Sequence, residues 1–191
     1  MPDLTILLLA AGASSRMRGR DKLLEQVAGQ PLLRLQAQRA LATGLPVLVT
    51  LPPDAAPRRA ALKDLPVTLI EVPDAATGMS ASLRAAAARV TGALMVLPAD
   101  MPEIDTQDMK ALIAAFDQSP DTCHRGAAAK GEPGHPVIFP ARLVPNFATL
   151  NGDEGARSLL KQHGARLVTL PGTHALTDLD TPEDWKAWRN P

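Results

Sequence analysis

Short runs of apolar residues alternate along the chain with longer stretches in which apolar residues recur every three or four positions. The short runs predict buried strands at 4–9, 46–51, 67–72 and 93–97, and the longer stretches predict helices at 31–42, 55–62, 80–90 and 105–117. Strands separated by helices of this length need crossover connections, which make the strands parallel and cover both faces of the sheet. The pattern therefore predicts an α/β fold of three layers, α/β/α, around a mostly parallel, Rossmann-like sheet.

The second half of the chain is less regular. Short strands are expected at 127–129 and 136–139, on either side of a turn at 131–134 that has the composition of a hairpin tip. Further elements are expected as helices at 141–149 and 154–163, a strand at 166–170, and a last helix that Pro182 opens. Because no linker, repeat or low-complexity segment interrupts 1–191, we expect a single domain.

The first strand ends in small residues, Ala10, Ala11 and Gly12, and a loop with four cationic side chains follows. Small side chains let a ligand approach the backbone closely, and free N–H groups in such a turn can meet anionic oxygens. Arg16 and Lys22 add positive charge, which suits a polyphosphate. The loop matches neither of the two best-known glycine-rich phosphate motifs, so an ordinary solvated loop remains the alternative.

Carboxylates follow the fourth strand and precede the last helix. Asp100 lies at the carboxyl edge of the predicted sheet, where ligands of such sheets bind, and it could hold Mg²⁺ or cap a turn. Asp178 and Asp180 are two residues apart, so in an extended segment they point the same way. Such a pair suits a divalent metal, although Asp180 or Thr181 could instead cap the helix at Pro182.

Polar residues at three further positions in the chain each allow two interpretations. The segment 78–82 predicts a helix N-terminus whose N–H groups and serines could hold a ligand, or Ser80 could simply cap the helix. His135 is either an ordinary turn histidine or a substrate contact. The segment 152–157 could simply be a helix start with Asp153 as its N-cap.

The composition of the chain limits the classes of partner that the protein could bind. The 20 basic and 20 acidic residues of the 191 give a net charge of zero, so no global field favours nucleic acid or an anionic membrane, and we expect small-molecule substrates. The single cysteine, Cys123, allows no internal disulfide and suits a reducing compartment, where we expect it to fill the core. No basic segment precedes the first apolar run and no run approaches the ~20 residues of a membrane span, so a cytoplasmic protein is expected.

The loop, Leu-Ala-Ala-Gly-x-Ser-x-Arg-Met followed by Lys22, resembles the signature of nucleotidyltransferases that activate sugars and cofactors with a nucleoside triphosphate. Five later segments narrow the resemblance to the molybdenum cofactor cytidylyltransferase branch, and they lie at 78–83, 97–102, 131–137, 152–157 and 178–184. The match runs from the first strand to the last helix. In the family a glycine commonly follows Arg-Met directly, whereas here Arg18 precedes Gly19.

The resemblance implies a Mg²⁺-dependent transfer of a nucleotidyl group from CTP to the terminal phosphate of molybdenum-molybdopterin, with release of pyrophosphate. It implies catalytic roles for Arg16, Lys22 and Asp100, and a metal held by Asp100 and Asp178, with Asp180 in reserve. CTP is expected as the donor because Ala11 stands where guanylyltransferase relatives carry a second glycine.

The resemblance also divides the chain into a nucleotide-binding part, about 1–104, and an acceptor-binding part, about 105–191. The implied nucleotide-binding residues are Leu9, Ala10, Ala11, Gly12, Ser14, Lys22, Gly78 and Ser80, and the implied acceptor-binding residues are His135, Arg157 and Asp180. A transient contact with a molybdoenzyme or its maturation factor is also expected.

Other functions fit the same residues. One is transfer of a guanylyl group to the same cofactor, or of a cytidylyl or uridylyl group to a sugar or alditol phosphate. Another is a protein that binds and delivers the cofactor without turnover. The presence of Lys22, Asp100 and Asp178 together favours an enzyme.

Overall fold

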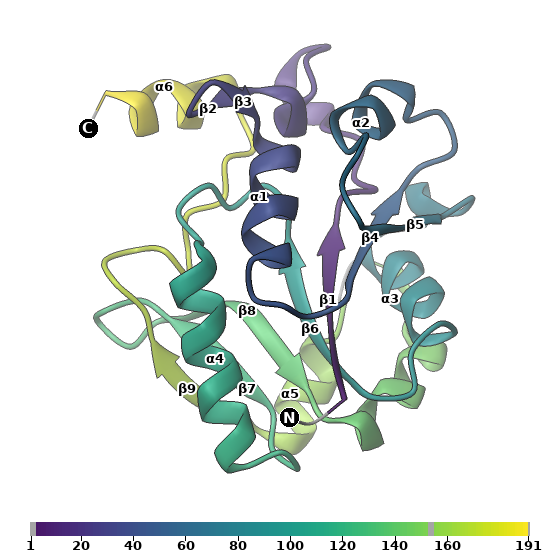
Figure 1. Cartoon of the computed structure of the whole chain (residues 1–191), viewed down its shortest axis with the longest axis vertical. Helices are drawn as coiled ribbons and strands as arrows, with labels where there is room; N and C mark the ends of the chain where they lie inside the picture. Colours follow the sequence, from purple (N-terminus) through teal and green to yellow (C-terminus); the bar gives the residue numbers. More distant parts are fainter. Residues whose placement is uncertain (1–2, 153–154, 191) are drawn as a thin grey trace.

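The computed structural model describes residues 3–152 and 155–190 and is built around a seven-stranded sheet (Figure 1). Its strands are β1 (Leu4–Leu9), β4 (Val47–Leu51), β5 (Thr68–Glu71), β6 (Ala93–Pro98), β7 (His124–Ala127), β8 (Pro133–Phe139) and β9 (Arg166–Thr169). They lie in the order β5-β4-β1-β6-β8-β7-β9. The first four in this order are parallel, β8 is antiparallel to both neighbours, and β9 is parallel to β7. The predicted mostly parallel, Rossmann-like sheet is confirmed.

Helices cover both faces of the sheet. One face is covered by α1 (Leu32–Leu41), α2 (Ala56–Ala61) and α4 (Thr106–Gln118), and the other by α3 (Met79–Ala87), the 3-10 helix η4 (Ala141–Thr149) and α5 (Arg157–His163). Successive residues of β1 alternate between the two cores, because side chains of a strand point to opposite faces. Ile6 and Leu8 pack beneath α1, whereas Leu7 packs with α3.

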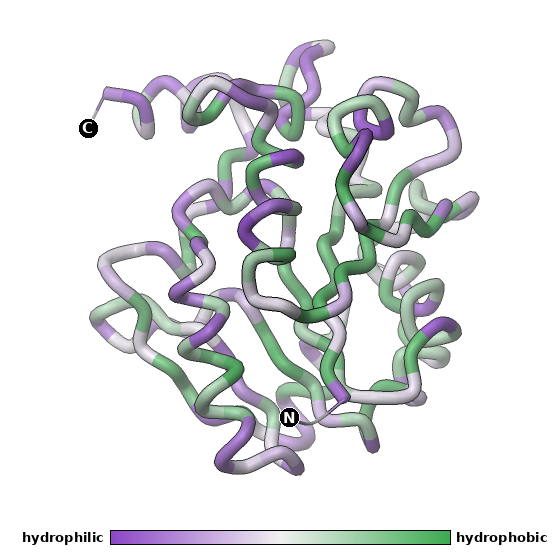
Figure 2. The backbone as a smooth tube through the Cα atoms, viewed as in Figure 1, coloured by the Kyte–Doolittle hydropathy of each residue, from purple (hydrophilic) through white to green (hydrophobic). Residues whose placement is uncertain are grey.

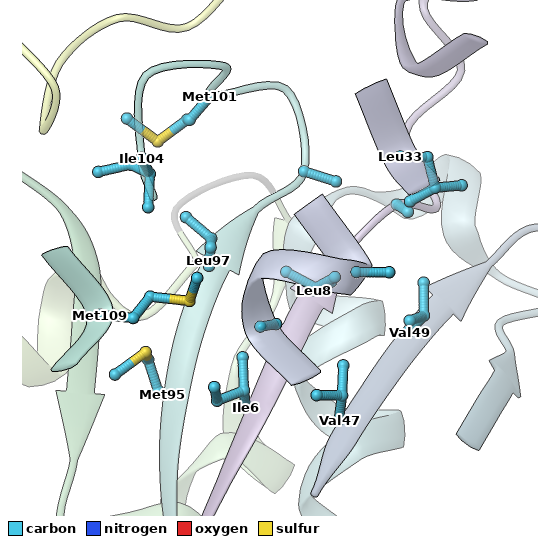
Figure 3. Close-up of a cluster of buried hydrophobic side chains, with 14 of the residues drawn as sticks. Ile6, Leu8, Leu33, Val47, Val49, Met95, Leu97, Met101, Ile104 and Met109 are labelled. Atoms are coloured by element: carbon cyan, nitrogen blue, oxygen red, sulfur yellow. The ribbon is translucent and has the colours of Figure 1, made fainter. Parts of the chain in front are cut away.

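The central strands are almost continuously apolar, as burial on both faces requires (Figure 2). Figure 3 shows the core on the α1 and α4 side, where Met95 and Leu97 of β6 meet Met109 of α4. This double burial holds the carboxyl ends of β1 and β6 beside each other, with Leu9 opposite Pro98. The two segments that follow these strands therefore start from adjacent points.

The structure changes several predicted boundaries. Helix α3 begins at Met79 after a Gly78 cap with φ of +110°, so the prediction of Ser80 as N-cap was wrong, and the helix ends at Ala87. Strands β7 and β8 start earlier than predicted, because their hairpin pairs Ala127 with Pro133 across a register shift.

Other differences concern short elements. The predicted helix over 141–149 is a 3-10 helix that contains Pro145, which has no N–H for an α-helical bond. The predicted helix over 154–163 is observed from Arg157, and residue 154 and the suggested Asp153 cap lie outside the described residues. The sequence analysis missed a small hairpin of β2 (Gln26–Val27) and β3 (Gln30–Pro31), which a two-residue turn at Ala28 and Gly29 closes.

The last helix, α6 (Pro182–Arg189), returns to the loop that follows β1. It begins at Pro182 after a Thr181 cap, which accepts a hydrogen bond from the N–H of Asp184. Its Trp185 packs in a small core with Met17 of the loop. Within the described chain, no helix is long and apolar enough to cross a membrane.

Candidate active site

A cleft of about 750 Å³ opens at the carboxyl ends of β1 and β6. This is the edge where open parallel sheets bind their ligands. The predicted site residues that line it are Leu9, Ala11, Gly12, Arg16, Lys22, Gly78, Asp100, His135, Arg157, Asp178 and Asp180. These residues come from segments far apart in the sequence, from Leu9 near its start to Asp180 near its end. The structure thus brings most of the predicted site into one cleft.

Three predicted nucleotide-binding residues do not line the cleft. Ala10 is buried beneath it, and the Ser14 hydroxyl donates to the carboxylate of Asp21, 3.2 Å away. Ser80 is fully buried, and its Oγ has no hydrogen-bond partner among the described residues. Ser82, two positions further along α3, lines the cleft instead, because side chains two apart point to different sides of a helix.

The turn after β1 leaves space for a ligand. A Cβ placed on Gly12 would meet no atom of the described chain within 4 Å, so a substrate group can come close to this backbone. The following short helices η1 (Ser15–Met17) and η2 (Lys22–Leu24) aim Arg16 and Lys22 at the cleft. Arg18, where the family commonly has glycine, adopts a left-handed φ of +53°, a conformation that glycine adopts without strain.

Lys22 joins the loop to two carboxylates. Its Nζ lies 2.5 Å from Asp100 Oδ2 and 2.5 Å from Asp180 Oδ1, and Arg16 Nη1 lies 2.8 Å from Asp180 Oδ2. Burial alone would lower the pKa of Lys22, but the charges and hydrogen bonds of Asp100 and Asp180 outweigh it and raise that pKa. Lys22 is therefore a protonated ammonium at neutral pH, held where β1 and β6 end.

The carboxylates fit a divalent cation. Asp100 Oδ1 is buried and has no hydrogen-bond partner among the described residues, so one oxygen remains for a ligand. Partial burial and the neighbouring charges of Asp100 and Asp180 raise the pKa of Asp178, which marks an excess of negative charge there. Asp180 is already paired with two cations, which leaves Asp178 as the better second ligand.

A metal at this site would need ligands beyond the protein. Within 3–152 and 155–190, no three His, Cys, Asp or Glu side chains cluster closely enough to hold a metal ion. A cation that keeps several waters and adds substrate phosphate oxygens needs only one or two carboxylates, and Mg²⁺ behaves in this way. Asp100 and Asp178 satisfy that requirement.

The far end of the cleft is cationic and partly apolar. Arg125, His135 and Arg157 line both the cleft and a neighbouring hollow of about 160 Å³, whose other walls include Phe139 and Leu160. Arg125 was not identified from the sequence, because an arginine in a short strand carries no motif. Its Nε donates to the Gly134 carbonyl oxygen at 2.8 Å. The two guanidinium groups make this end suited to an anionic acceptor.

Gly134 allows β8 to approach the segment that precedes Asp178. A Cβ at this position would lie 1.8 Å from the Ala175 carbonyl oxygen, so only glycine permits the contact. The N–H of His135 donates to that same oxygen at 2.8 Å. This contact fixes the segment that leads to Asp178 against β8, which explains why residues from two distant motifs share one cleft.

The acid stability of the protein should depend on His135. Burial, reinforced by Arg125 and Arg157, lowers the pKa of His135 to about 4. An unfolded histidine has a pKa of about 6.5, so the unfolded chain binds the proton more tightly than the folded protein does. The free energy of unfolding therefore falls as the pH drops from about 6.5 to about 4. Below pH ~4 the contribution levels off, because both states are then protonated.

We expect His135→Gln to lose this part of the acid sensitivity, which amounts to at most about 3 kcal/mol. Urea unfolding of wild type and variant at several pH values between about 4 and 7 measures it. His163→Gln, at the exposed end of α5, is the matched control. Parallel stability curves for wild type and His135→Gln would contradict the assignment.

The sheet edge, the open turn, and the lysine held between carboxylates agree with the nucleotidyltransferase class that the comparisons show. The model of the MobA-like NTP transferase domain matches residues 6–167, and the chain belongs to this family. It is therefore an enzyme of the nucleotidyltransferase class, and the superfamily expected from the loop is confirmed.

Relatives cover nearly the whole chain. The purine catabolism protein PucB of Bacillus subtilis is 32% identical over 96% of this chain and 95% of its own. The molybdenum cofactor guanylyltransferase of Cereibacter sphaeroides is 30% identical over 93% of this chain and 91% of its own. Several further relatives are also named guanylyltransferases, so the expected cytidylyl branch is not decided by these names.

Solved structures agree with the fold. Rv0371c of Mycobacterium tuberculosis H37Rv superimposes with a TM-score of 0.85 at 27% identity, covering 97% of this chain and 96% of its own. A structure of Rv0371C in complex with manganese has a TM-score of 0.80 at 26% identity, and covers 97% of both chains. A protein of similar fold thus binds a divalent metal, as nucleotidyltransferases typically do.

Proposed function

We propose that the protein transfers a nucleotidyl group from a nucleoside triphosphate to the terminal phosphate of the molybdenum cofactor. A phosphate oxygen of the acceptor forms a bond to the α-phosphorus, the bond to the β-phosphate oxygen breaks, and pyrophosphate leaves. The observation that carries the proposal is Lys22 seated between Asp100 and Asp180 at the sheet edge, beside an unpartnered Asp100 oxygen. The relatives named molybdenum cofactor guanylyltransferases support the acceptor.

Catalysis in this proposal rests on positioning and charge, without a covalent intermediate. Arg16 and Lys22 bind the β- and γ-phosphates, and their charge stabilises the departing pyrophosphate. Asp100 and Asp178 would hold Mg²⁺, and the bound ion would supply positive charge near the phosphorus under attack. Arg157 and Arg125 bind the anionic acceptor, and His135, neutral at physiological pH because of its low pKa, lines the same cleft and contacts the acceptor.

The proposed donor is GTP, because the relatives most often carry the name guanylyltransferase. CTP is the second candidate, and a specific observation favours it. The Ala11 side chain lines the cleft in the turn after β1, where a methyl group takes space that a purine would need.

The test is pyrophosphate release with Mg²⁺ from GTP, CTP, ATP and UTP, each with molybdenum-molybdopterin, a sugar phosphate or an alditol phosphate. We expect release only with molybdenum-molybdopterin, and fastest with GTP or CTP. Pyrophosphate release with a sugar or alditol phosphate would identify that compound as the acceptor in place of molybdenum-molybdopterin. Tight binding of molybdenum-molybdopterin without release from any triphosphate would favour a delivery protein instead.

Ala11→Gly should shift donor selectivity toward GTP whichever donor the wild type prefers. Removing one methyl from the wall of the cleft gives a larger base more room, and a difference of this size changes relative kcat/KM by about 10- to 200-fold at most. Parallel kinetics with GTP and CTP on wild type and variant measure the shift. Ala129→Gly, in the exposed β7–β8 turn, controls for a general effect of added flexibility. An unchanged GTP to CTP ratio in Ala11→Gly would remove Ala11 from base recognition.

The proposal includes three further expectations. The nucleotide is bound mainly by residues up to about 104 and the acceptor mainly by those after it. The reaction takes place in the cytoplasm, in keeping with a single, buried cysteine, and the product passes to a molybdoenzyme or its maturation factor through a transient contact.

A further inference from the structure

Arg58 is a buried arginine of α2 that does not line the cleft, and no motif marks it. Only 5% of the residue is exposed, although arginine is seldom fully buried unless it is paired. Its partners all belong to the loop that follows β1. Nη1 donates to the Ala10 carbonyl oxygen at 2.6 Å, and Nε and Nη2 donate to the two oxygens of Asp21 at 2.6 and 2.9 Å.

A fourth contact reaches the middle of the loop. Arg58 Nη2 lies 3.2 Å from Ser14 Oγ, and this hydroxyl in turn donates to Asp21 Oδ1 at 3.2 Å. One planar guanidinium therefore holds the start of the loop at Ala10, its interior at Ser14 and its end at Asp21. Lysine carries a single point of charge and cannot reproduce this fork.

The loop needs such support. Ser14 and Arg18 both adopt left-handed φ values, +51° and +53°, which disfavour residues other than glycine. Strained backbone of this kind persists only where the surroundings hold it in place. On the opposite side, Met17 packs on Trp185 of α6. The loop is thus held from both sides, by Arg58 of α2 and by α6.

The connection from Arg58 leads directly to Lys22. Asp21 Oδ1 accepts a hydrogen bond from the N–H of Leu23 at 3.0 Å, so the carboxylate that Arg58 grips also caps the short helix whose first residue is Lys22. At the start of the loop, Arg58 donates to the carbonyl oxygen of Ala10. This residue directly precedes the Ala11–Gly12 turn that lines the cleft. Both phosphate-facing parts of the loop therefore depend on one side chain.

We propose that Arg58 is a positioning residue for nucleoside triphosphate, which presets the Ala10–Lys22 loop through Asp21 and Ser14 without touching the substrate. The inference rests on the proposed function, since it assigns the triphosphate to this loop. A loop that already has its bound conformation loses no conformational entropy when the ligand binds. Loss of the Arg58 hydrogen bonds would add this entropy cost and so weaken triphosphate affinity.

Isothermal titration calorimetry with GTP and with CTP, each in Mg²⁺, tests the proposal on the full chain. We expect Arg58→Lys to raise the Kd of the bound triphosphate by about tenfold, the loss of one charge-assisted hydrogen bond. In steady-state assays the KM for triphosphate rises, while the KM for molybdenum-molybdopterin stays unchanged. Arg59→Lys is the matched control, because Arg59, the neighbour of Arg58 on α2, pairs only with Glu71 at the surface. We expect this variant to leave the Kd and the KM for triphosphate unchanged.

Asp21→Asn keeps an oxygen for the Leu23 N–H but removes the charge that Arg58 grips. If the two side chains act as one unit, the double variant binds triphosphate no more weakly than the weaker single variant. Both substitutions are mild, so the cycle needs no truncation of the buried Arg58 side chain.

An Arg58→Lys protein that is less stable to heat but binds triphosphate like the wild type would overturn the inference, because Arg58 would then be purely structural. The proposed function would survive that result. If the wild type binds no triphosphate at all, the proposed function and this inference both fail.

Discussion

Asp100→Asn is expected to reduce kcat by about 10³-fold, which corresponds to about 4 kcal/mol of lost transition-state stabilisation. The amide keeps the size of the side chain but removes the charge that a divalent cation needs. Asp100 Oδ1 has no hydrogen-bond partner among the described residues, so replacing this oxygen by an amide nitrogen breaks no hydrogen bond, and the remaining oxygen can still accept one from Lys22. Stability should therefore change little, because Lys22 keeps its second partner, Asp180.

Pyrophosphate release measures kcat, and thermal unfolding reports whether the variant is folded. Calorimetric titration with Mn²⁺ in the presence of triphosphate should show weaker metal binding in the variant. Asp117→Asn, at an exposed position on α4, is the control for a lost surface charge. Near-normal turnover of Asp100→Asn with Mg²⁺ would remove Asp100 from the metal site, and attention would turn to Asp178.

Lys22→Ala is expected to lower kcat/KM for triphosphate by about 10²- to 10³-fold, the effect of losing one preorganised donor at a developing charge. Charge grows on the departing pyrophosphate, so kcat should fall as well as affinity. Unlike the Asp100 variant, this one should also lose stability, by about 1–3 kcal/mol, because two carboxylates lose a charged hydrogen-bond donor that they share.

Steady-state kinetics and urea unfolding separate the two effects. Lys22→Arg restores the charge but not the compact ammonium between Asp100 and Asp180, so we expect partial recovery of stability and less of activity. Lys110→Ala, exposed on α4, controls for a change in net charge. An unchanged kcat/KM in Lys22→Ala would mean that Lys22 serves only to hold the carboxylates.

Combining the two substitutions tests whether Asp100 and Lys22 act on the same part of the substrate. Asp100 and Lys22 contact each other, so their effects should not add, and the double variant should be only slightly worse than the more damaged single variant. Additive losses would mean that each residue acts on a different part of the substrate.

Local patterns determined the architecture. The largely apolar run at Leu4–Leu9 was predicted with the observed bounds, because a strand buried on both faces is apolar at nearly every position. Alternation of strands and helices implied parallel neighbours, and therefore that Gly12 and Asp100 would meet at one sheet edge. That inference needed only chain direction, and the cleft contains both residues.

Tertiary structure alone decided the contacts within that edge. Ser80 and Ser82 look equivalent in the sequence, but the rotation of α3 buries the first and turns the second toward the cleft. Helix α3 starts at Met79, two residues earlier than Ser80 as N-cap implies. A helix face is fixed by what it packs against, which the local sequence does not state.

Long-range polar partners were equally hidden. Arg58 and Arg125 lie in ordinary helical and strand contexts, and their roles come from Asp21 and from the acceptor end of the cleft, respectively. The sequence determined the fold class and the residue types available for phosphate and metal, because periodicity and motif chemistry are local. Which cations and carboxylates meet was decided only by packing, because charge pairs form wherever the folded backbone brings their atoms within about 3 Å.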